Sequence, residues 1–357
     1  MPHPESRAPW SDVLRWLIVV PVSAGIGYVL DDLGIHAAWI VAGILASGAM
    51  ALVSRRELPL NGAVERAARG VIGVLAGLSL VGVDYGSMLH FIVPGIVVAL
   101  VTVGIGVGSG VLLSRHEKEV SVETGILGML PGGSSTLPVI ARDTGADYRL
   151  VALSQYLRLL IVSLTLPVVG GLTFGSPLDL SGHATNPQLA PTLVLIAIAL
   201  IGPYIGKALH FPAPHIFAPL LITPLAALAF HDPSSIVLPE PVRIVALLTI
   251  GWMCGGGLST RSLKLFGKQL PMTIACIAFT ILACAASAWA LMLVTGSTYF
   301  EAYLATSPGG LETVLALASE GAVGPIVVSL QIIRLITLLI IAGYLPTIIA
   351  VMRRFGR

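Results

Sequence analysis

Long apolar runs separated by short polar loops fill most of the chain. The uninterrupted runs cover 13–30, 35–53, 66–83, 88–113 and 149–174 in the first half, and 189–209, 214–230, 243–258, 270–295 and 325–351 in the second. A helix of about 20 apolar residues crosses the roughly 30 Å hydrocarbon core of a bilayer. The pattern therefore predicts an all-α polytopic membrane protein.

Two further apolar stretches, 122–141 and 300–319, are interrupted by Pro-Gly-Gly. Proline removes a backbone donor and disfavours helix in the residue before it. Unpaired backbone groups are costly in lipid, so such a break is tolerated only inside the protein or beside a water-filled cavity. We therefore expect each stretch to be a broken, re-entrant helix that enters and leaves the membrane on one side.

The two Pro-Gly-Gly segments open two copies of one long motif, 131–158 and 308–334. Each copy passes through a Gly-Ala pair and closes with Gln-x-x-Arg. Pro131 corresponds to Pro308 and Gln155 to Gln331, so the second copy is shorter by a single position. A repeat of this length predicts an N-terminal half, 1–180, and a structurally related C-terminal half, 181–357.

Loop charges predict how the halves are oriented. The loops 31–34, 84–90, 175–188 and 296–299 contain no Lys or Arg. If both broken stretches are re-entrant, these loops face outside and the basic loops face the cytoplasm, as the positive-inside rule requires. About five spans then remain in each half, and an odd number makes the halves inverted repeats. Both termini are expected in the cytoplasm.

Composition agrees with a membrane protein and excludes several classes of function. Charged residues make up 11% of the chain, against about 25% in a soluble domain. No Lys/Arg block suggests nucleic acid, and the cysteines and histidines lack metal-site spacing, so neither a metal nor a cofactor is expected. The first apolar run lacks a cleavage site and predicts a retained anchor. The glycine-rich segment 104–110 predicts a helix-packing face.

The tips of the two broken stretches form the first part of a candidate substrate site. Ser134 and Ser135 can cap a half-helix after the first break, and its free N–H groups suit an anion. The second copy has Glu312 in place of Ser135, so the site is asymmetric. A single break favours a glycine hinge without a ligand, whereas two in corresponding halves favour a binding site.

The two arginines, Arg158 and Arg334, form the second part of the candidate substrate site. Arg158 lies about ten residues into its apolar run, roughly 15 Å deep at 1.5 Å per residue. Arg334 is equally deep from the opposite face, so we expect the two to meet near the midplane, with Gln155 and Gln331 one turn away. An unpaired guanidinium there costs at least about 2.5–3.5 kcal/mol. A substrate carboxylate or an internal salt bridge would pair it. The salt-bridge candidates are Glu312, Glu123, Asp143, Asp147 and Glu301.

A buried carboxyl can carry a proton or help to hold Na⁺, which makes acidic residues candidates for ion coupling. The alternative for Glu312 is a salt bridge with an arginine. The candidate ion-coupling residues are Glu312 and Asp147. The candidate substrate-binding residues are Pro131, Gly132, Gly133, Ser134, Ser135, Gln155, Arg158, Pro308, Gly309, Gly310, Glu312, Gln331 and Arg334.

The doubled motif resembles that of the bacterial AbrB-type membrane protein family, also called the AbrB duplication family and labelled ammonia monooxygenase. The resemblance spans about 14–350, and Val323 departs from it because the first copy has Asp147 there. The resemblance implies the fold of the cation/proton antiporter and anion transporter group, with a homodimer by analogy. The motif residues are Pro131, Gly132, Gly133, Gly145, Ala146, Asp147, Gln155 and Arg158, then Pro308, Gly309, Gly310, Gln331 and Arg334.

Topology and motifs together predict a secondary active transporter of a small organic anion, coupled to H⁺ or Na⁺, in the bacterial inner membrane. The alternative is a non-transporting inner-membrane sensor that influences the regulation of gene expression through a partner. The longest loops hold about 15 residues, too few for a soluble signalling domain of 50 or more. An enzyme is not expected, because the oxygenase label has no copper-ligand constellation behind it.

Overall fold

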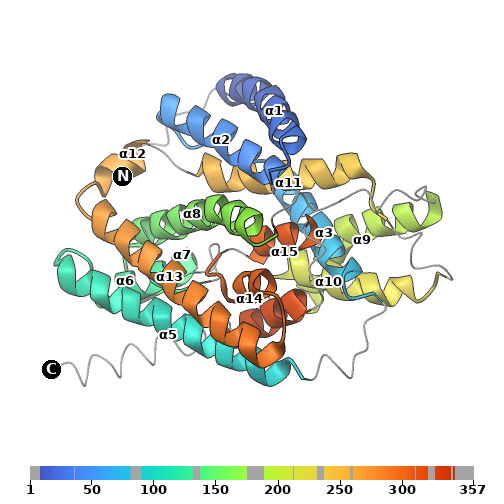
Figure 1. The fold of residues 1–357 in the computed structure, drawn as a ribbon. Coiled ribbons are helices and arrows are strands. Elements are labelled where there is room, and N and C mark those ends of the chain that lie inside the picture. The colour runs from blue at the N-terminus through green and yellow to red at the C-terminus, as the bar shows by residue number, and fades with distance from the viewer. Residues whose placement is uncertain are drawn as a thin grey trace.

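The computed structural model describes most of the chain, and every regular element in the described part is a helix (Figure 1). The motif residues Gly132, Gly133, Ser134, Ser135 and Gly310 lie outside the described residues, as does the side chain of Glu312. The described residues are 9–35, 37–81, 90–131, 137–174, 189–211, 213–230, 237–257, 260–309, 311–320, 326–338 and 341.

Within these ranges, five helices are long and apolar enough to cross a bilayer. They are α1 (Pro9–Asp32), α5 (Ile92–His116), α8 (Tyr148–Phe174), α9 (Leu189–Ala208) and α13 (Leu270–Thr295). The shorter apolar helices are α2 (Ala38–Val53), α10 (Pro214–Ala227) and Ile326–Leu338. The other helices are α3 (Gly62–Leu78), α6 (Val122–Met129), α7 (Leu137–Thr144), α11 (Glu240–Gly256), α12 (Thr260–Leu265), α14 (Tyr299–Thr306) and α15 (Leu311–Glu320). These are the helices of a multi-pass membrane protein.

Four of the predicted spans form helices shorter than the roughly 20 residues that cross a bilayer. The helices α2, α3, α10 and α11 have 16, 17, 14 and 17 residues. At 1.5 Å per residue they extend about 21–26 Å, less than a full hydrocarbon core. Local residues set two of these helix boundaries. Helix α2 stops at Ser54, next to Arg55 with its positive φ of 55°, and the Asn61 side chain caps the start of α3.

The helix boundaries recur along the chain. The shift in residue number that relates Pro131 to Pro308 also relates the first and last residues of α6 to the first and last residues of α14. The same shift brings the starts of α2, α3 and α5 within one residue of the starts of α10, α11 and α13. Packing recurs too, since α2 packs on α11 as α10 packs on α3, and α5 packs on α6 as α13 packs on α14.

The main packing contacts divide the helices into two groups. The first group is α1, α2, α3, α9, α10 and α11, and the second is α5, α6, α7, α13 and α14. Helix α8 contacts members of both groups, as does α15, and Figure 1 shows both helices near the middle of the molecule. Because 59% of the membrane-length part of α8 is buried, against 17% for α1, α8 is the more enclosed of the two.

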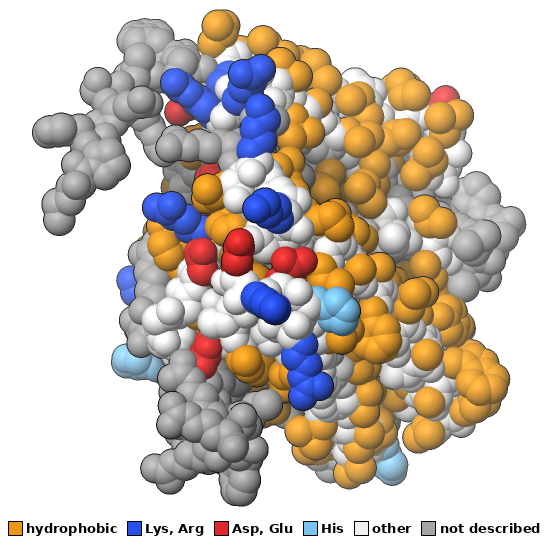
Figure 2. All heavy atoms as spheres, turned by 90° about the vertical axis from the view of Figure 1, so that its left-hand side faces the viewer, with side chains coloured by type: hydrophobic (Ala, Val, Ile, Leu, Met, Phe, Trp, Pro, Cys, Tyr) orange, Lys and Arg blue, Asp and Glu red, His pale blue; other side chains and the backbone are white. Residues whose placement is uncertain are grey.

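The surface combines a charged band with large exposed apolar areas, as expected of a protein in a bilayer. Figure 2 shows charged side chains gathered in a band on one face, while much of the rest of that view is hydrophobic. Large apolar side chains such as Leu17, Leu282 and Leu293 are about two-thirds exposed, at 65%, 69% and 65%. Lipid can cover such residues, whereas the charged band fits a surface in contact with water.

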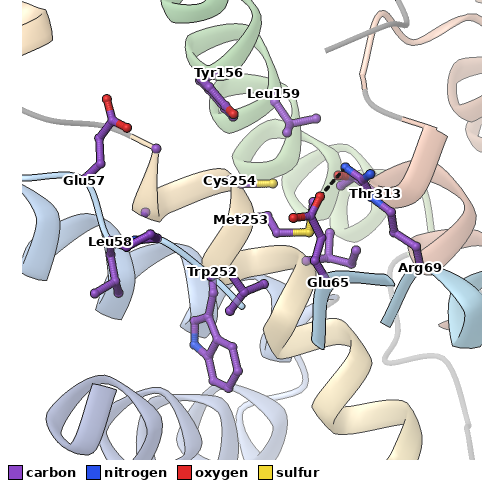
Figure 3. A pocket seen from close by; sticks show the side chains of 15 residues that line it. Glu57, Leu58, Glu65, Arg69, Tyr156, Leu159, Trp252, Met253, Cys254 and Thr313 are labelled. Carbon is purple, nitrogen blue, oxygen red and sulfur yellow. Dashed lines mark ion pairs between the residues drawn. The ribbon is translucent and has the colours of Figure 1, made fainter. Parts of the chain in front are cut away.

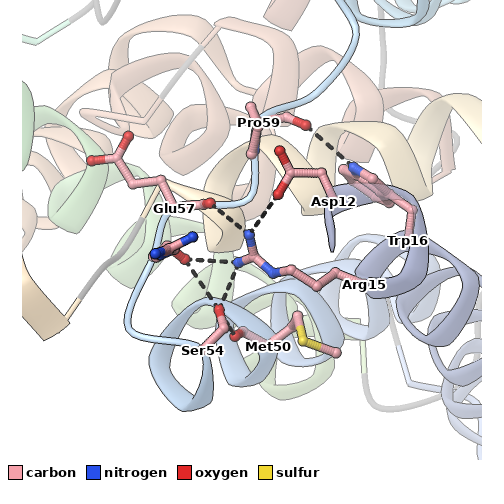
Figure 4. Close-up of polar contacts among 8 residues, drawn as sticks. Asp12, Arg15, Trp16, Met50, Ser54, Glu57 and Pro59 are labelled. Atoms are coloured by element: carbon pink, nitrogen blue, oxygen red, sulfur yellow. Dashed lines mark hydrogen bonds and ion pairs between the residues drawn. The ribbon is translucent and has the colours of Figure 1, made fainter. Parts of the chain in front are cut away.

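One arginine ties α1 to the loop that joins α2 and α3. Arg15 donates through Nη2 to the Ser54 hydroxyl at 2.6 Å and to the Arg56 carbonyl at 2.8 Å, and through Nη1 to the Glu57 carbonyl at 3.1 Å (Figure 4). The neighbouring Trp16 ring N–H donates to the Pro59 carbonyl. The start of α1 therefore holds this loop in place.

Arg15→Gln is expected to loosen residues 54–60 without unfolding the protein, because the shorter amide cannot reach all three acceptors. Amide hydrogen exchange in this loop should become roughly tenfold faster, equivalent to about 1.4 kcal/mol. Arg115→Gln, at an exposed arginine near the end of α5, is the control. Unchanged exchange in the loop would mean that other contacts hold it.

Candidate functional site

The two broken stretches begin at opposite ends of α13. Helix α6 begins near Glu119, whose carboxylate accepts a 2.7 Å hydrogen bond from Gln269, the residue before α13. Helix α14 begins three residues after Gly296, which ends α13. Helix α13 has 26 residues and is therefore about 39 Å long. The half-helices α6 and α14 thus begin near opposite ends of α13.

Each half-helix begins with a side-chain cap and ends at its proline. The Ser121 hydroxyl accepts from the Thr124 N–H at the start of α6, and Thr298 forms a capping box with Glu301 at the start of α14. Both helices stop two residues before Pro131 or Pro308, because proline has no N–H to continue the ladder. The last carbonyls of both half-helices therefore need other donors.

Arg158 and Gln155 supply these donors in the first copy. Arg158 donates through Nη1 to the carbonyls of Met129 at 3.1 Å and Leu130 at 2.7 Å, and through Nη2 to Oε1 of Gln155 at 2.6 Å. The Nε2 of Gln155 in turn donates to the Leu127 carbonyl at 2.9 Å. The Gln-x-x-Arg motif thus caps the end of α6 and places a cation at the negative end of its dipole.

The second copy repeats the arrangement. The Nε2 of Gln331 donates to the Leu304 carbonyl at 2.7 Å, and Arg334 donates to the carbonyls of Ser307 and Gly309. The shift that relates the two prolines also relates Leu304 and Ser307 to Leu127 and Leu130, the acceptors of the first copy. The two motifs therefore perform the same capping task at corresponding half-helices.

The two arginines lie in the interior, within electrostatic range of each other. Both are almost fully buried, with 3% exposure each, and Arg334 acts electrostatically on Arg158, as the nearby Cys284 does on both. Cys284 belongs to α13, and its carbonyl accepts from the Thr306 hydroxyl at the end of α14, at 3.1 Å. The two half-helices thus end close to one pair of like charges.

The partners of the arginines within the described residues are groups that the sequence analysis did not consider. Sequence reasoning weighed a carboxylate of the protein against a carboxylate of a substrate. Within the described residues, both guanidinium groups donate to backbone carbonyls, Arg158 also donates to Gln155, and none of the ion pairs involves either arginine. A half-helix end can take the place of an anion here because its last carbonyls carry partial negative charge.

Two of the candidate salt-bridge carboxylates cap helices. The Asp147 carboxylate is exposed and accepts from the N–H groups of Arg149 and Leu150 at the start of α8. Glu301 belongs to the cap of α14, while Glu123 is buried in the first turn of α6. Asp147 therefore caps a helix, and its role in ion coupling stays a prediction. The side chains of Asp143 and Glu312 lie outside the described residues.

The second break packs on the helix that carries Arg158. Gly309 lies so close to α8 that a Cβ on it would be 2.9 Å from Val162, and the Ser163 hydroxyl lies 3.4 Å from that of Thr313. Pro131, Pro308 and Gly309 are buried. Helix α8 therefore contacts both broken stretches.

Two buried polar atoms at the arginine pair lack a hydrogen-bond partner in the described part of the chain. They are Nε of Arg158 and Oε1 of Gln331. A buried polar group without a partner costs about 1–3 kcal/mol, so each atom is a place where a ligand or water would be stabilised. One is a donor and the other an acceptor.

The structure also contains a pocket that the sequence analysis missed. It has a volume of about 200 Å³ and lies beside Tyr156 of α8 and Thr313 of α15, against α3, α11 and the loop before α3 (Figure 3). Its charged residues are Glu57, Glu65 and Arg69. The signal available in the sequence was a Glu and an Arg four residues apart at the start of a predicted span.

Among the described residues no three His, Cys, Asp or Glu side chains are grouped as a metal site. The cysteines there, Cys254, Cys276 and Cys284, are buried and form no disulfide.

Known proteins match the chain over nearly its whole length. The family described as "Transition state regulatory protein AbrB" matches residues 39–352. The Escherichia coli (strain K12) protein named "Putative regulator AbrB" is 30% identical, over 92% of this chain and 94% of that protein. The Bacillus subtilis (strain 168) protein named "Uncharacterized protein YhjN" is 25% identical, over 91% of this chain and 90% of that protein. The family match includes both copies of the Pro-Gly-Gly motif, and the chain belongs to the AbrB family.

Proposed function

We propose that the protein is a secondary active transporter of a small organic anion, coupled to H⁺ or Na⁺. The observation that carries this proposal is the convergence of two half-helices from opposite ends of α13 on the buried pair Arg158 and Arg334. Broken helices that meet inside a membrane protein are a recurrent way to build a transport site. Two like charges held near each other in an apolar interior favour an anion.

The proposed substrate site consists of the two breaks and the two Gln-x-x-Arg motifs. The buried Nε of Arg158 and Oε1 of Gln331 offer one donor and one acceptor to a bound carboxylate and its substituents. The half-helices that follow the breaks would add N–H groups of their own. Glu312 is the first candidate for the coupling proton or Na⁺, and Asp147 the second.

The proposed topology is a pair of inverted repeats with re-entrant breaks, in the bacterial inner membrane and with both termini cytoplasmic. The common shift between corresponding helices supports the repeat, and the opposite entry of α6 and α14 supports the inversion. A homodimer belongs to the same proposal by analogy of fold.

Alternating access would use the two helix groups. The group of α5, α6, α7, α13 and α14 carries both half-helices that lead to the arginines, while the group of α1, α2, α3, α9, α10 and α11 packs largely on itself. Movement of the first group against the second would open the site to one side of the membrane and then to the other. The contacts of α8 and α15 with both groups would guide that movement.

Charge movement in proteoliposomes on a solid-supported membrane tests the proposal. Pulses of small mono- and dicarboxylates, with and without Na⁺ and at two pH values, are expected to give a current for at least one anion class. Arg334→Lys keeps the charge but loses the planar fork, so its current should fall at least tenfold, while Arg149→Gln at the exposed start of α8 keeps it. Silence of the folded wild-type protein toward every anion under every gradient would reject transport.

The second candidate is a membrane sensor that influences gene expression. The name of the Escherichia coli relative, which says regulator, favours it. A sensor predicts that Arg158→Lys changes transcription in cells while anion accumulation stays at the wild-type level. A transporter predicts that both change together.

A further inference from the structure

The pocket beside Tyr156 has the composition of a binding site rather than of a packing defect. Its volume of about 200 Å³ exceeds the roughly 150 Å³ of a cavity that admits benzene. One wall is apolar and includes Leu159, Ile250 and Met253. A dry packing void would be lined by such residues alone, whereas this pocket also has a charged side.

The charged side is an ion pair with a defined geometry. Glu65 and Arg69 lie one turn apart on α3, and their Oε1 and Nη2 atoms are 3.0 Å apart. Figure 3 shows the pair beside Thr313, across the pocket from Tyr156 and Glu57. Both members are partly buried, with side-chain exposures of 32% and 14%, so a ligand in the pocket can reach them.

An acceptor and a donor 3.0 Å apart are complementary to the head group of an α-amino acid. Its ammonium and carboxylate are attached to one carbon and are therefore similarly close, with the charges in the opposite order. The ammonium would bind Glu65 while the carboxylate binds Arg69 as a charge-assisted pair. Glu57 adds a second negative charge at the exposed side of the pocket, which disfavours a plain anion.

We infer that this pocket binds a small apolar α-amino acid as a zwitterion, with its head group on Glu65 and Arg69 and its side chain on the apolar wall. The site is separate from the arginine-capped breaks. The pocket is lined by Thr313 of the second broken stretch, so a ligand in the pocket would contact that stretch directly. The proposed amino-acid site does not depend on whether the protein transports an anion.

Binding of leucine to the purified, full-length protein in detergent tests the inference, measured by titration calorimetry and by the shift of the unfolding temperature. Leucine is expected to bind, while N-acetyl-leucine, leucinamide and 4-methylpentanoate displace it at least tenfold more weakly than leucine itself does, because each lacks one charge of the head group. Glycine should also bind more weakly, since it leaves the apolar wall empty.

Variants locate the site. Glu65→Gln keeps the side-chain shape but not the charge, and should weaken leucine binding at least tenfold. Arg66→Gln, on the exposed face of the same helix and outside the pocket lining, should leave binding unchanged.

Three results would overturn the inference: no leucine binding by the folded wild-type protein, equal binding of the analogues, or unaltered leucine binding in folded Glu65→Gln. If Glu65→Gln fails to fold, the comparison of leucine with its analogues on the wild-type protein still decides the question. Because all of these are binding measurements, a failure of the inference is distinct from a failure of transport.

Discussion

Arg158→Ala is expected to lower the unfolding temperature of the detergent-purified protein strongly. The substitution removes the donors to the Met129 and Leu130 carbonyls and leaves Oε1 of Gln155 without its partner. Each buried acceptor that loses its partner costs about 1–3 kcal/mol. A loss of several kcal/mol is a large fraction of the stability of most proteins.

Matched variants separate capping from substrate binding. Arg334→Ala should be similarly unstable, because it uncaps the corresponding half-helix α14. Arg158→Lys should lie between alanine and wild type, since an ammonium lacks the planar fork that reaches two carbonyls. Arg149→Gln, on the exposed first turn of α8, should melt with the wild type. If Arg158→Ala melts at the wild-type temperature, the carbonyl contacts contribute nothing to stability, and the capping interpretation fails.

Gly110→Leu is expected to prevent correct folding of the first broken stretch. A Cβ at this position would lie 2.5 Å from Cα of Ile126 and 2.6 Å from the carbonyl of Gly125. Both are backbone atoms of α6, so no side-chain adjustment can relieve the overlap. The clash would separate α5 from α6, and the carbonyls that Arg158 binds would move with α6. The monodisperse fraction in fluorescence-detected size-exclusion chromatography should fall several-fold.

The control for this change is two residues away on the same helix. A Cβ at Gly108 would have no atom within 4 Å, so Gly108→Leu adds the same side chain without a clash. It should elute as the wild type does. Equal profiles for the two variants would show that α5 and α6 tolerate separation, and that close packing is not what holds the first break.

Several features of the fold could be predicted because they depend on local chemistry. Pro131 and Pro308 have no N–H to continue a helix, and α6 and α14 stop two residues before them. The prediction of a packing face at 104–110 is confirmed for Gly106 and Gly110, which touch the backbone near the first break, while Gly104 and Gly108 touch nothing. The lengths of the spans were predicted less well, because α2 begins later and α3 ends earlier than the apolar runs do.

The partners of the arginines could not be predicted, for a physical reason. Sequence reasoning searched for carboxylates, which are visible as residue types, whereas every residue has a carbonyl. Only the three-dimensional path of α6 shows that Met129 and Leu130 present theirs to Arg158. The pocket was hidden for a related reason, since Glu65, Tyr156 and Thr313 come from segments far apart in the chain.

The capping of both half-helices by arginine has an electrical consequence. Within the described residues both guanidinium groups bind backbone carbonyls, and helix dipoles offset a guanidinium charge only in part. A full charge that crosses the membrane field exchanges about 2.3 kcal/mol with every 100 mV. Displacement of the helices that hold Arg158 and Arg334 would therefore be voltage-dependent in the empty protein. A bound monoanion would reduce that dependence, and a bound dianion would nearly abolish it.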